Sequence, residues 1–253
     1  MPFASWRLGE RKNRSFVRVC AMKSNGFAGD KKLPLKSPLA KWERAFIDKC
    51  IPGFPRWIEG YHLTLCTILW SAGVILFGYL ASKNIHWLWA SSFMLVMQWF
   101  TDSFDGSLGR YRDTGIPKWG YYMDHFLDYI FACSLAIGYA FFLHGTARYI
   151  PLVLAFIYGA FMISAFLAFA ATNELKITYL GVGPTETRLL FIMVNTLVIL
   201  FGVRWLEILV PWVLVVSLTV LSVAVFRTQK YIWKIDMNDK KARLTSSQKD
   251  IGK

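Results

Sequence analysis

The sequence predicts an all-α integral membrane protein with six transmembrane helices, which follow an amphipathic helix at the cytoplasmic surface. The composition is the first reason: 55% of the 253 residues are hydrophobic, 17% are aromatic, and the mean hydropathy is +0.38. These values are high for a soluble domain. The second reason is a set of apolar runs, most of them near the ~20 residues that span a bilayer, at residues 63–81, 85–104, 121–143, 151–172, 189–203 and 208–226.

The chain before the first span divides into two parts. Gly, Lys and Pro interrupt any helical period in residues 1–36, so we expect a basic, unstructured segment there. Ser37 and Pro38 fit an N-cap and a first-turn proline, and they predict a helix within residues 37–55. We expect this helix to lie on the cytoplasmic leaflet, or else to pack on a neighbouring loop. Its apolar face would hold Leu39, Trp42, Phe46 and Cys50, and its polar face Lys41, Glu43, Arg44, Asp48 and Lys49.

The basic residues predict how the chain sits in the membrane. The formal net charge is +13, with eleven Lys and Arg in residues 1–44 and eight from Arg227 onward. Six spans put both ends on one side, and the positive-inside rule makes that side cytoplasmic. We therefore expect a six-helix catalytic domain over residues 56–227 and a basic cytoplasmic tail over residues 228–253. The basic ends suit anionic membrane lipids, and we expect no nucleic-acid partner.

Four aspartates occur at the ends of two apolar segments. Asp102 and Asp105 are three residues apart, and Asp124 and Asp128 are four apart, so each pair shares one face of its helix. Ionisable groups at membrane depth are expensive and usually functional. The motif contains no buried base, so its acids would repel one another unless cations neutralise them. Carboxylate oxygens suit hard divalent cations such as Mg²⁺, and Mn²⁺ accepts the same ligands.

Small residues and one arginine accompany these acids. Gly106 and Gly109 have no Cβ, so a ligand can approach the backbone closely after the first acid pair. Arg110 supplies a guanidinium that can grip a phosphate. Gly120 permits close approach of the third helix just before the second pair. The whole string therefore predicts a cytoplasmic site for a metal-bound phosphate group.

The string resembles the signature of the CDP-alcohol phosphotransferase family: Asp-x2-Asp-Gly-x2-Ala-Arg, then eight or nine residues, then Gly-x3-Asp-x3-Asp. Only Gly109 departs, since alanine is usual there. The resemblance covers roughly residues 38–226. It implies an enzyme of phospholipid synthesis in which an alcohol displaces CMP from a CDP-linked group, and it implies a homodimer.

The resemblance also assigns roles to the site residues. Two Mg²⁺ ions are expected to be held on the diphosphate by Asp102, Asp105, Asp124 and Asp128. The nucleotide and its phosphates are expected to contact Gly106, Gly109 and Arg110. Thr64 weakly matches a nucleotide-facing threonine at the start of the family's first span.

Two further features resemble the cholinephosphotransferase and ethanolaminephosphotransferase branch, whose members transfer a phospho-head group to diacylglycerol. His125 directly follows Asp124, and Glu186 ends the stretch Gly183-Pro184-Thr185-Glu186 before the fifth span. In that branch the histidine is proposed as the base that deprotonates the acceptor, with the glutamate beside it. The alternative is that a neighbour satisfies His125 and that Glu186 only caps its helix.

Other functions remain open at this point. Phe126 stands where the aminoalcohol branch has a glycine, which leaves the acceptor open. The CDP-diacylglycerol enzymes, which act on inositol, glycerol phosphate or serine, share the same core and length. In those enzymes Asp128 would serve as the base, and Lys176 or Arg188 would bind an acidic acceptor. A cation transporter would leave the glycines and Arg110 without a role. An inactive scaffold would not need all four acids.

Overall fold

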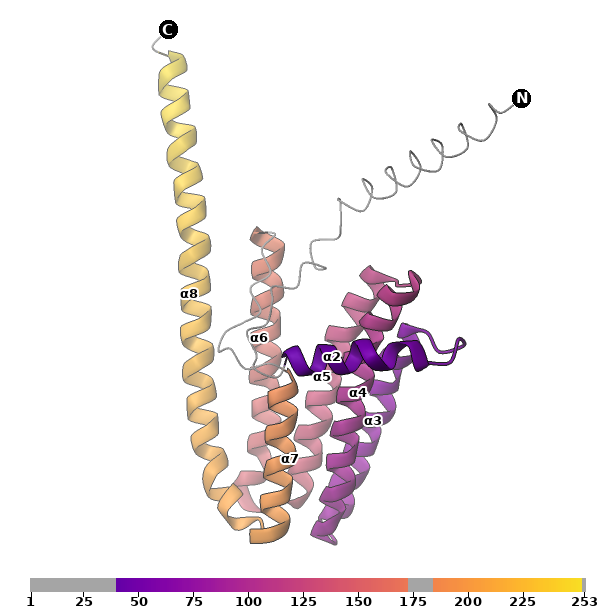
Figure 1. Ribbon diagram of the computed structural model, residues 1–253. Coiled ribbons are helices and arrows are strands. Elements are labelled where there is room, and N and C mark those ends of the chain that lie inside the picture. The colour runs from indigo at the N-terminus through magenta and orange to yellow at the C-terminus, as the bar shows by residue number, and fades with distance from the viewer. Residues whose placement is uncertain (1–39, 173–183, 252–253) are drawn as a thin grey trace, which may run out of the picture. The chain divides into compact units, whose positions relative to one another are not determined.

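The computed structural model describes residues 40–172 and 184–251, all within one unit of the chain, Pro34–Lys253. These residues form helices and contain no strand, which confirms the all-α prediction (Figure 1). The predicted basic segment 1–36 and Lys176 lie outside the described residues. The α-helices are α2 (Ala40–Cys50), α3 (Gly60–Ala81), α4 (Leu88–Arg112), α5 (Pro117–Phe142), α6 (Ile150–Thr172), α7 (Pro184–Phe201) and α8 (Arg204–Ile251), with short 3₁₀ turns at Ile51–Gly53, Ile85–Trp87 and Gly145–Tyr149.

In the described part of the chain, five helices are long and apolar enough to cross a membrane: α3, α5, α6, α7 and α8. They fit a multi-pass integral membrane protein. The sixth predicted span corresponds to α4, which is not among the five. Helix α4 carries Asp102, Asp105 and Arg110, and it buries polar residues such as Gln98 inside the protein. These polar residues lower the hydropathy of α4, and its place as a sixth span stays a prediction.

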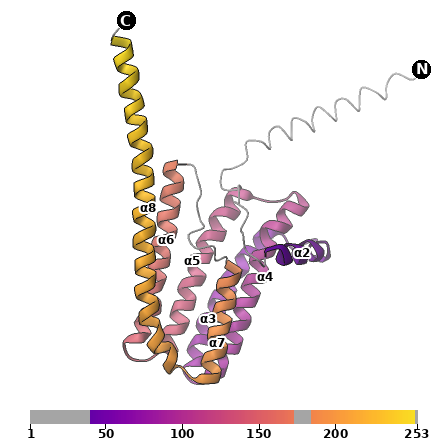
Figure 2. The ribbon, with the colours of Figure 1, turned by 60° about the vertical axis from the view of Figure 1, so that its left-hand side comes forward.

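Helix α3 brings the two acid-bearing helices together. It packs along both α4 and α5, while α4 also packs on α7, α5 on α6, and α6 on α8 (Figure 2). Gly78 of α3 meets Gly138 of α5 so closely that a Cβ on Gly78 would lie 2.4 Å from the Gly138 Cα. Such small-residue contacts let membrane helices approach each other. They set the spacing of α3 and α5.

Two apolar clusters lie at opposite ends of α3 and α4. One joins Val74, Leu95 and Phe131 to residues of α7 and α8, at the end where α3 stops and α4 begins. The other joins Leu63 and Phe104, beside the acids, to residues of α2 and the turn that follows it. The acid-bearing end of the bundle is thus held by packing against α2.

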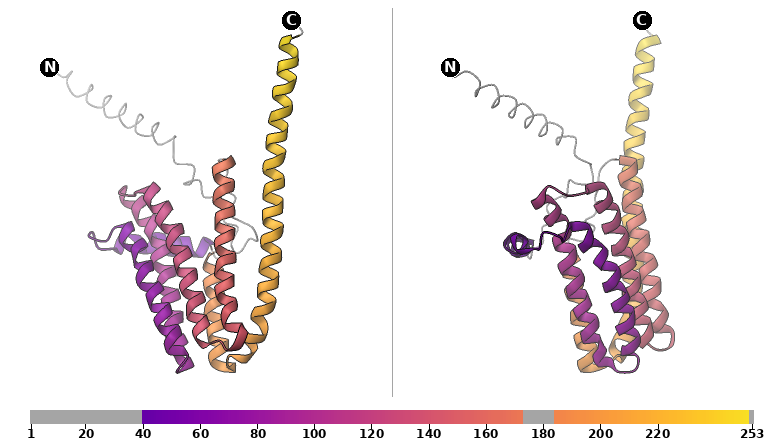
Figure 3. Two further views of the ribbon diagram at one scale, coloured as in Figure 1. Left: turned by 180° about the vertical axis from the view of Figure 1, so that it is seen from behind. Right: turned by 90° about the vertical axis from the view of Figure 1, so that its right-hand side faces the viewer.

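Helix α2 occurs where the sequence predicts a helix, but a different face is buried. Figure 3 shows it almost end-on in the right-hand view, crossing the bundle helices. Ile47 and Ile51 are buried, whereas Trp42 is 79% exposed. Glu43, which we expected on the polar face, accepts hydrogen bonds from α4 and α7. Helix α2 therefore docks on α4 through a face about a quarter turn from the predicted apolar one, and the contact of the apolar face with lipid stays a prediction.

Candidate metal centre

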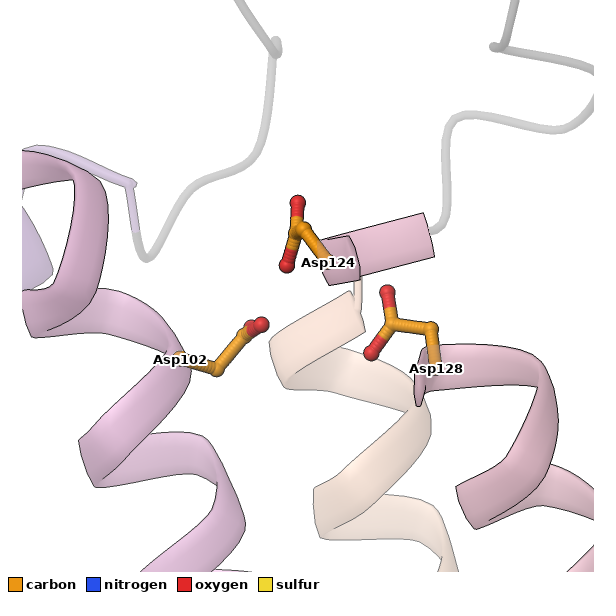
Figure 4. Close-up of side chains that lie close together, drawn as sticks. All are labelled: Asp102, Asp124 and Asp128. Carbon is orange, nitrogen blue, oxygen red and sulfur yellow. The ribbon is translucent and has the colours of Figure 1, made fainter. Parts of the chain in front are cut away.

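Three carboxylates converge between α4 and α5. Asp102 comes from α4, and Asp124 and Asp128 come from successive turns of α5. One oxygen from each lies within 4.8 Å of the others, and all three residues are half-buried. Figure 4 shows the three side chains pointing toward a common space from their separate helix turns. The helical spacing of the acids and the packing of α3 on both helices produce this arrangement.

The donor set fits a divalent cation. Mg²⁺ binds oxygen at about 2.1 Å, so two ligands on opposite sides of one ion lie about 4.2 Å apart. The three oxygens, at up to 4.8 Å, reach that spacing with shifts of less than about 1 Å. Carboxylates are hard ligands that suit Mg²⁺ and Mn²⁺ alike. The residues therefore fit the predicted metal, and Asp102, Asp124 and Asp128 are its candidate ligands.

Asp105, the fourth predicted ligand, is held beside this group. Its Oδ2 accepts a hydrogen bond of 2.7 Å from the Thr64 hydroxyl, and its Oδ1 accepts one from the Gly106 amide. Asp105 is near enough to Asp124 for their charges to interact. Thr64 is buried and reaches Asp105 from α3. In the structure Thr64 thus orients Asp105. The contact with a nucleotide that the family resemblance implies for Thr64 stays a prediction.

A buried base belongs to the cluster, contrary to the expectation that the acids would have none among them. Arg188 of α7 is only 9% exposed, and its Nη2 lies 2.8 Å from Oδ2 of Asp102. The same nitrogen is 3.9 Å from Oδ1 of Asp128. Sequence reasoning offered Arg188 only as a ligand for an acidic acceptor. The sequence did contain a clue, because an ionisable residue within a membrane helix is often paired with another charged residue.

His125 is oriented by its own helix. Its Nδ1 lies 2.7 Å from the carbonyl oxygen of Tyr121, which can only accept a hydrogen bond. The ring proton is therefore on Nδ1, and Nε2 is the nitrogen that can take up a proton. The ring packs against Tyr121 and Phe166, with centroids 4.5 and 5.5 Å away. Glu186 lies in the first turn of α7, and its action on His125 stays a prediction.

The glycines of the motif differ in their surroundings. A Cβ on Gly120 would meet nothing within 4 Å, and one on Gly106 would meet only the flexible end of Arg110, itself exposed. These positions leave room for a ligand. Gly109 is buried, however, and a Cβ there would lie 3.1 Å from the Gly115 Cα. The connection between α4 and α5 fills the space that we expected a ligand to use.

Three further side chains near the acids escaped the sequence reasoning. Gln98, fully buried one turn before Asp102, places its Nε2 3.5 Å from Oδ1 of Asp128. Arg112 donates to backbone carbonyls of Phe54, Pro55 and Ile58, and so holds the segment before α3 against the end of α4. Glu43 joins α2 to α4 and α7. Gln98 could have been found, since a polar residue in an apolar run shares a helix face with Asp102.

Comparison with known proteins identifies a family whose model covers the helices that carry the acids. Residues 61–228 match the family model described as CDP-alcohol phosphatidyltransferase. The match spans α3 to the first half of α8, including all four aspartates, His125 and Arg188, and it leaves out α2. Neither a curated protein nor a solved structure shows significant similarity to the chain.

Proposed function

Because the chain belongs to the CDP-alcohol phosphatidyltransferase family, we propose that it moves a phospho-alcohol group from CDP-choline or CDP-ethanolamine to a lipid hydroxyl, such as that of diacylglycerol. Membership makes the chain a transferase of phosphate-containing groups with a CDP-alcohol donor and an alcohol or lipid acceptor. It also places the chain in membrane phospholipid synthesis. The observation that carries the proposal is the convergence of Asp102, Asp124 and Asp128 within 4.8 Å in a protein of this family.

The family is metal-dependent, and the acids supply the donors for the ions. When bound there, divalent cations would supply the positive charge that neutralises a diphosphate and a departing CMP oxygen. Asp102, Asp124 and Asp128 would hold them, and Asp105, held by Thr64, would be the fourth ligand. Gly106 and Arg110, both exposed beside Asp105, would receive the phosphates and the nucleotide. The identity of the ions, Mg²⁺ or Mn²⁺, belongs to the proposal.

His125 is our proposed base. The proton of the acceptor hydroxyl passes to Nε2, the hydroxyl oxygen bonds to phosphorus, and the bond from that phosphorus to the CMP oxygen breaks. Two contacts of Nδ1 support this role: its hydrogen bond to the Tyr121 carbonyl, and its distance of 3.8 Å from Oδ2 of Asp124. Glu186, in the first turn of α7, would stabilise the charged ring, as the resemblance to the aminoalcohol branch implies.

The membrane arrangement is part of the same proposal. Helix α4 would be a sixth span, because it has 25 residues and packs along α3 and α7. The charge distribution would then put both termini and the acids on the cytoplasmic side. Helix α2 would lie at that surface with Trp42 toward lipid, and the basic ends would contact anionic headgroups. We also carry forward the homodimer that the family resemblance implies.

A second candidate has one observation in its favour. In a CDP-diacylglycerol-dependent enzyme, Asp128 would act as the base on a small alcohol such as inositol, glycerol phosphate or serine. Arg188, 3.9 Å from Asp128, would then lie near an acidic acceptor. This arrangement gives His125 no chemical role.

The two candidates separate in one experiment on the purified protein in detergent with Mg²⁺. One set of reactions contains head-group-labelled CDP-choline or CDP-ethanolamine with diacylglycerol, and the other contains CDP-diacylglycerol with a panel of small alcohols. Label that enters lipid in the first set supports the aminoalcohol reaction. Product only in the second set rejects it and moves the base to Asp128.

A further inference from the structure

We propose that Arg188 is an exchangeable counter-ion of the metal centre. It pairs with Asp102 when no metal is bound, gives up that carboxylate when metal binds, and then holds a phosphate of the CDP-linked donor. The proposal rests on the proposed function, whose CDP-linked donor it needs, but not on the choice between the two branches. It assigns Arg188 to the donor, and not to an acidic acceptor.

The ion pair occupies the place where a metal would bind. Nη2 of Arg188 lies 2.8 Å from Oδ2 of Asp102 and 3.9 Å from Oδ1 of Asp128, two of the three converging acids. A divalent cation on these carboxylates would lie within a few ångströms of the guanidinium. Two cations so close in a half-buried site repel each other strongly. Metal binding and the Arg188 pair therefore compete.

A displaced Arg188 needs a new anion. In the described part of the chain, the carboxylates within ion-pair range of Arg188 are those of Asp102 and Asp128. Both would be committed to metal in the loaded site. A buried guanidinium without an anion is costly, so Arg188 would favour any ligand that brings a negative charge. A phosphate suits it best, because the guanidinium fork donates two parallel hydrogen bonds to phosphate oxygens.

The charge of the cluster gives the order of binding. Four aspartates and one arginine leave the metal-free cluster net negative, which repels a diphosphate. Two divalent cations reverse the sign of that charge. The donor therefore binds after the metals, and metal loading itself makes Arg188 available to the donor.

The backbone that carries Arg188 is held in place while its side chain changes partners. Thr185, one turn earlier on α7, donates to Glu43 of α2 at 3.1 Å. The same carboxylate accepts a hydrogen bond of 2.8 Å from Ser103, the neighbour of Asp102 on α4. The start of α7 is thus fixed to the helix that carries Asp102. Figure 4 shows the ribbon of α7 beside Asp102 and Asp128. The exchange that we propose is a rotation of the Arg188 side chain on this fixed backbone.

Arg188→Gln tests the proposal through two binding measurements on the nucleotide-free protein in detergent. The first is the affinity for Mn²⁺, from the paramagnetic resonance signal of the free ion. The second is the affinity for CDP at saturating Mg²⁺, from calorimetry. We expect Mn²⁺ to bind about fivefold more tightly and CDP about tenfold more weakly. A purely structural arginine would not move the two affinities in opposite directions.

Two other variants keep the test decisive. Arg188→Lys retains the charge without the fork, so we expect a nearly unchanged Mn²⁺ affinity and weaker CDP binding. This variant provides the test if Arg188→Gln does not fold. Arg227→Gln removes the same charge from an exposed site on α8 and is expected to change neither affinity. Weaker Mn²⁺ binding in Arg188→Gln, or unchanged CDP binding in either Arg188 variant, would overturn the proposal. A wild-type protein that binds CDP but transfers no choline or ethanolamine phosphate would reject the proposed function alone.

Discussion

Thr64 of α3 donates a hydrogen bond of 2.7 Å from its hydroxyl to Oδ2 of Asp105 on α4. The bond crosses from the first helix of the bundle to the second and aims a predicted metal ligand. The other oxygen of Asp105 accepts from the amide of Gly106. Both oxygens of this acid are therefore oriented before any ligand arrives.

Removing the Thr64 hydroxyl is expected to weaken metal binding. Thr64→Val keeps the shape of the side chain but frees Asp105 to rotate, and the Mg²⁺ concentration for half-maximal activity should rise about tenfold. Thr64→Ser should restore it. Thr67→Val is the matched control, since Thr67 is also buried on α3. An unchanged Mg²⁺ requirement in Thr64→Val would show that Asp105 needs no orientation.

Asp105 itself is expected to be essential for metal-dependent donor binding. Asp105→Asn removes one charge at nearly constant volume and should weaken CDP binding in Mg²⁺ at least about 100-fold. Calorimetry with and without EDTA measures the effect. Asp113→Asn is the control, because Asp113 is exposed at the end of the same helix. Metal-dependent CDP binding that survives in Asp105→Asn would contradict the four-acid site.

His125→Ala separates the two proposed bases. If His125 accepts the proton, its loss should lower transfer by about 100-fold or more while CDP binding is retained. Measured kcat should fall, and the CDP dissociation constant should stay within about twofold. His86→Ala, exposed in the turn before α4, controls for loss of a histidine. Nearly full activity in His125→Ala would instead favour Asp128 as the base.

Arg112 and Arg110, two residues apart, are expected to differ in stability and activity. Arg112 donates to several backbone carbonyls of the segment before α3, so Arg112→Ala should lower the melting temperature in detergent by about 4–8 °C. Arg110 is exposed and bonds Ser107, so Arg110→Ala should leave the melting temperature unchanged while activity falls. Equal thermal shifts in the two variants would reject this division.

Two glycines offer a comparison of helix contacts. A Cβ on Gly78 would lie 2.4 Å from backbone of α5, whereas one on Gly109 would lie 3.1 Å from the Gly115 Cα. Gly78→Ala must push α3 and α5 apart, so we expect a loss of several degrees in melting temperature and lower activity. Gly109→Ala needs a shift of only a few tenths of an ångström, and its melting temperature should change by less than about 3 °C. The opposite ranking would mean that α4 and its connection to α5 are the tighter contact.

The sequence predicted the helices well because hydropathy and helical period act locally. Five apolar runs correspond to helices that can span a membrane, and the spacing of Asp124 and Asp128 placed both acids on one face. Helix α8 continues as one helix to Ile251, through the predicted tail. The end of the apolar run indicates where the chain leaves the membrane. It does not indicate where the helix ends, because a helix can continue through polar sequence.

Residues whose roles depend on a distant partner could not be placed in the same way. The pairing of Arg188 with Asp102 joins residues 86 positions apart, and the bond from Thr64 to Asp105 joins residues 41 apart. Patterns within one helix cannot predict which residue of another helix will be the partner. The partners of Glu43 on α4 and α7 are likewise distant in the sequence, so the face through which α2 docks could not be predicted from its own residues.

The most direct test of the account is CMP release from CDP-choline or CDP-ethanolamine by the purified protein with diacylglycerol. We predict release that requires Mg²⁺ or Mn²⁺, stops with EDTA, and returns when the metal is restored. Each mole of CMP should be matched by a mole of head group in lipid. CMP release that continues after metal removal would contradict the metal centre, and metal-dependent release only from CDP-diacylglycerol would contradict the proposed donor.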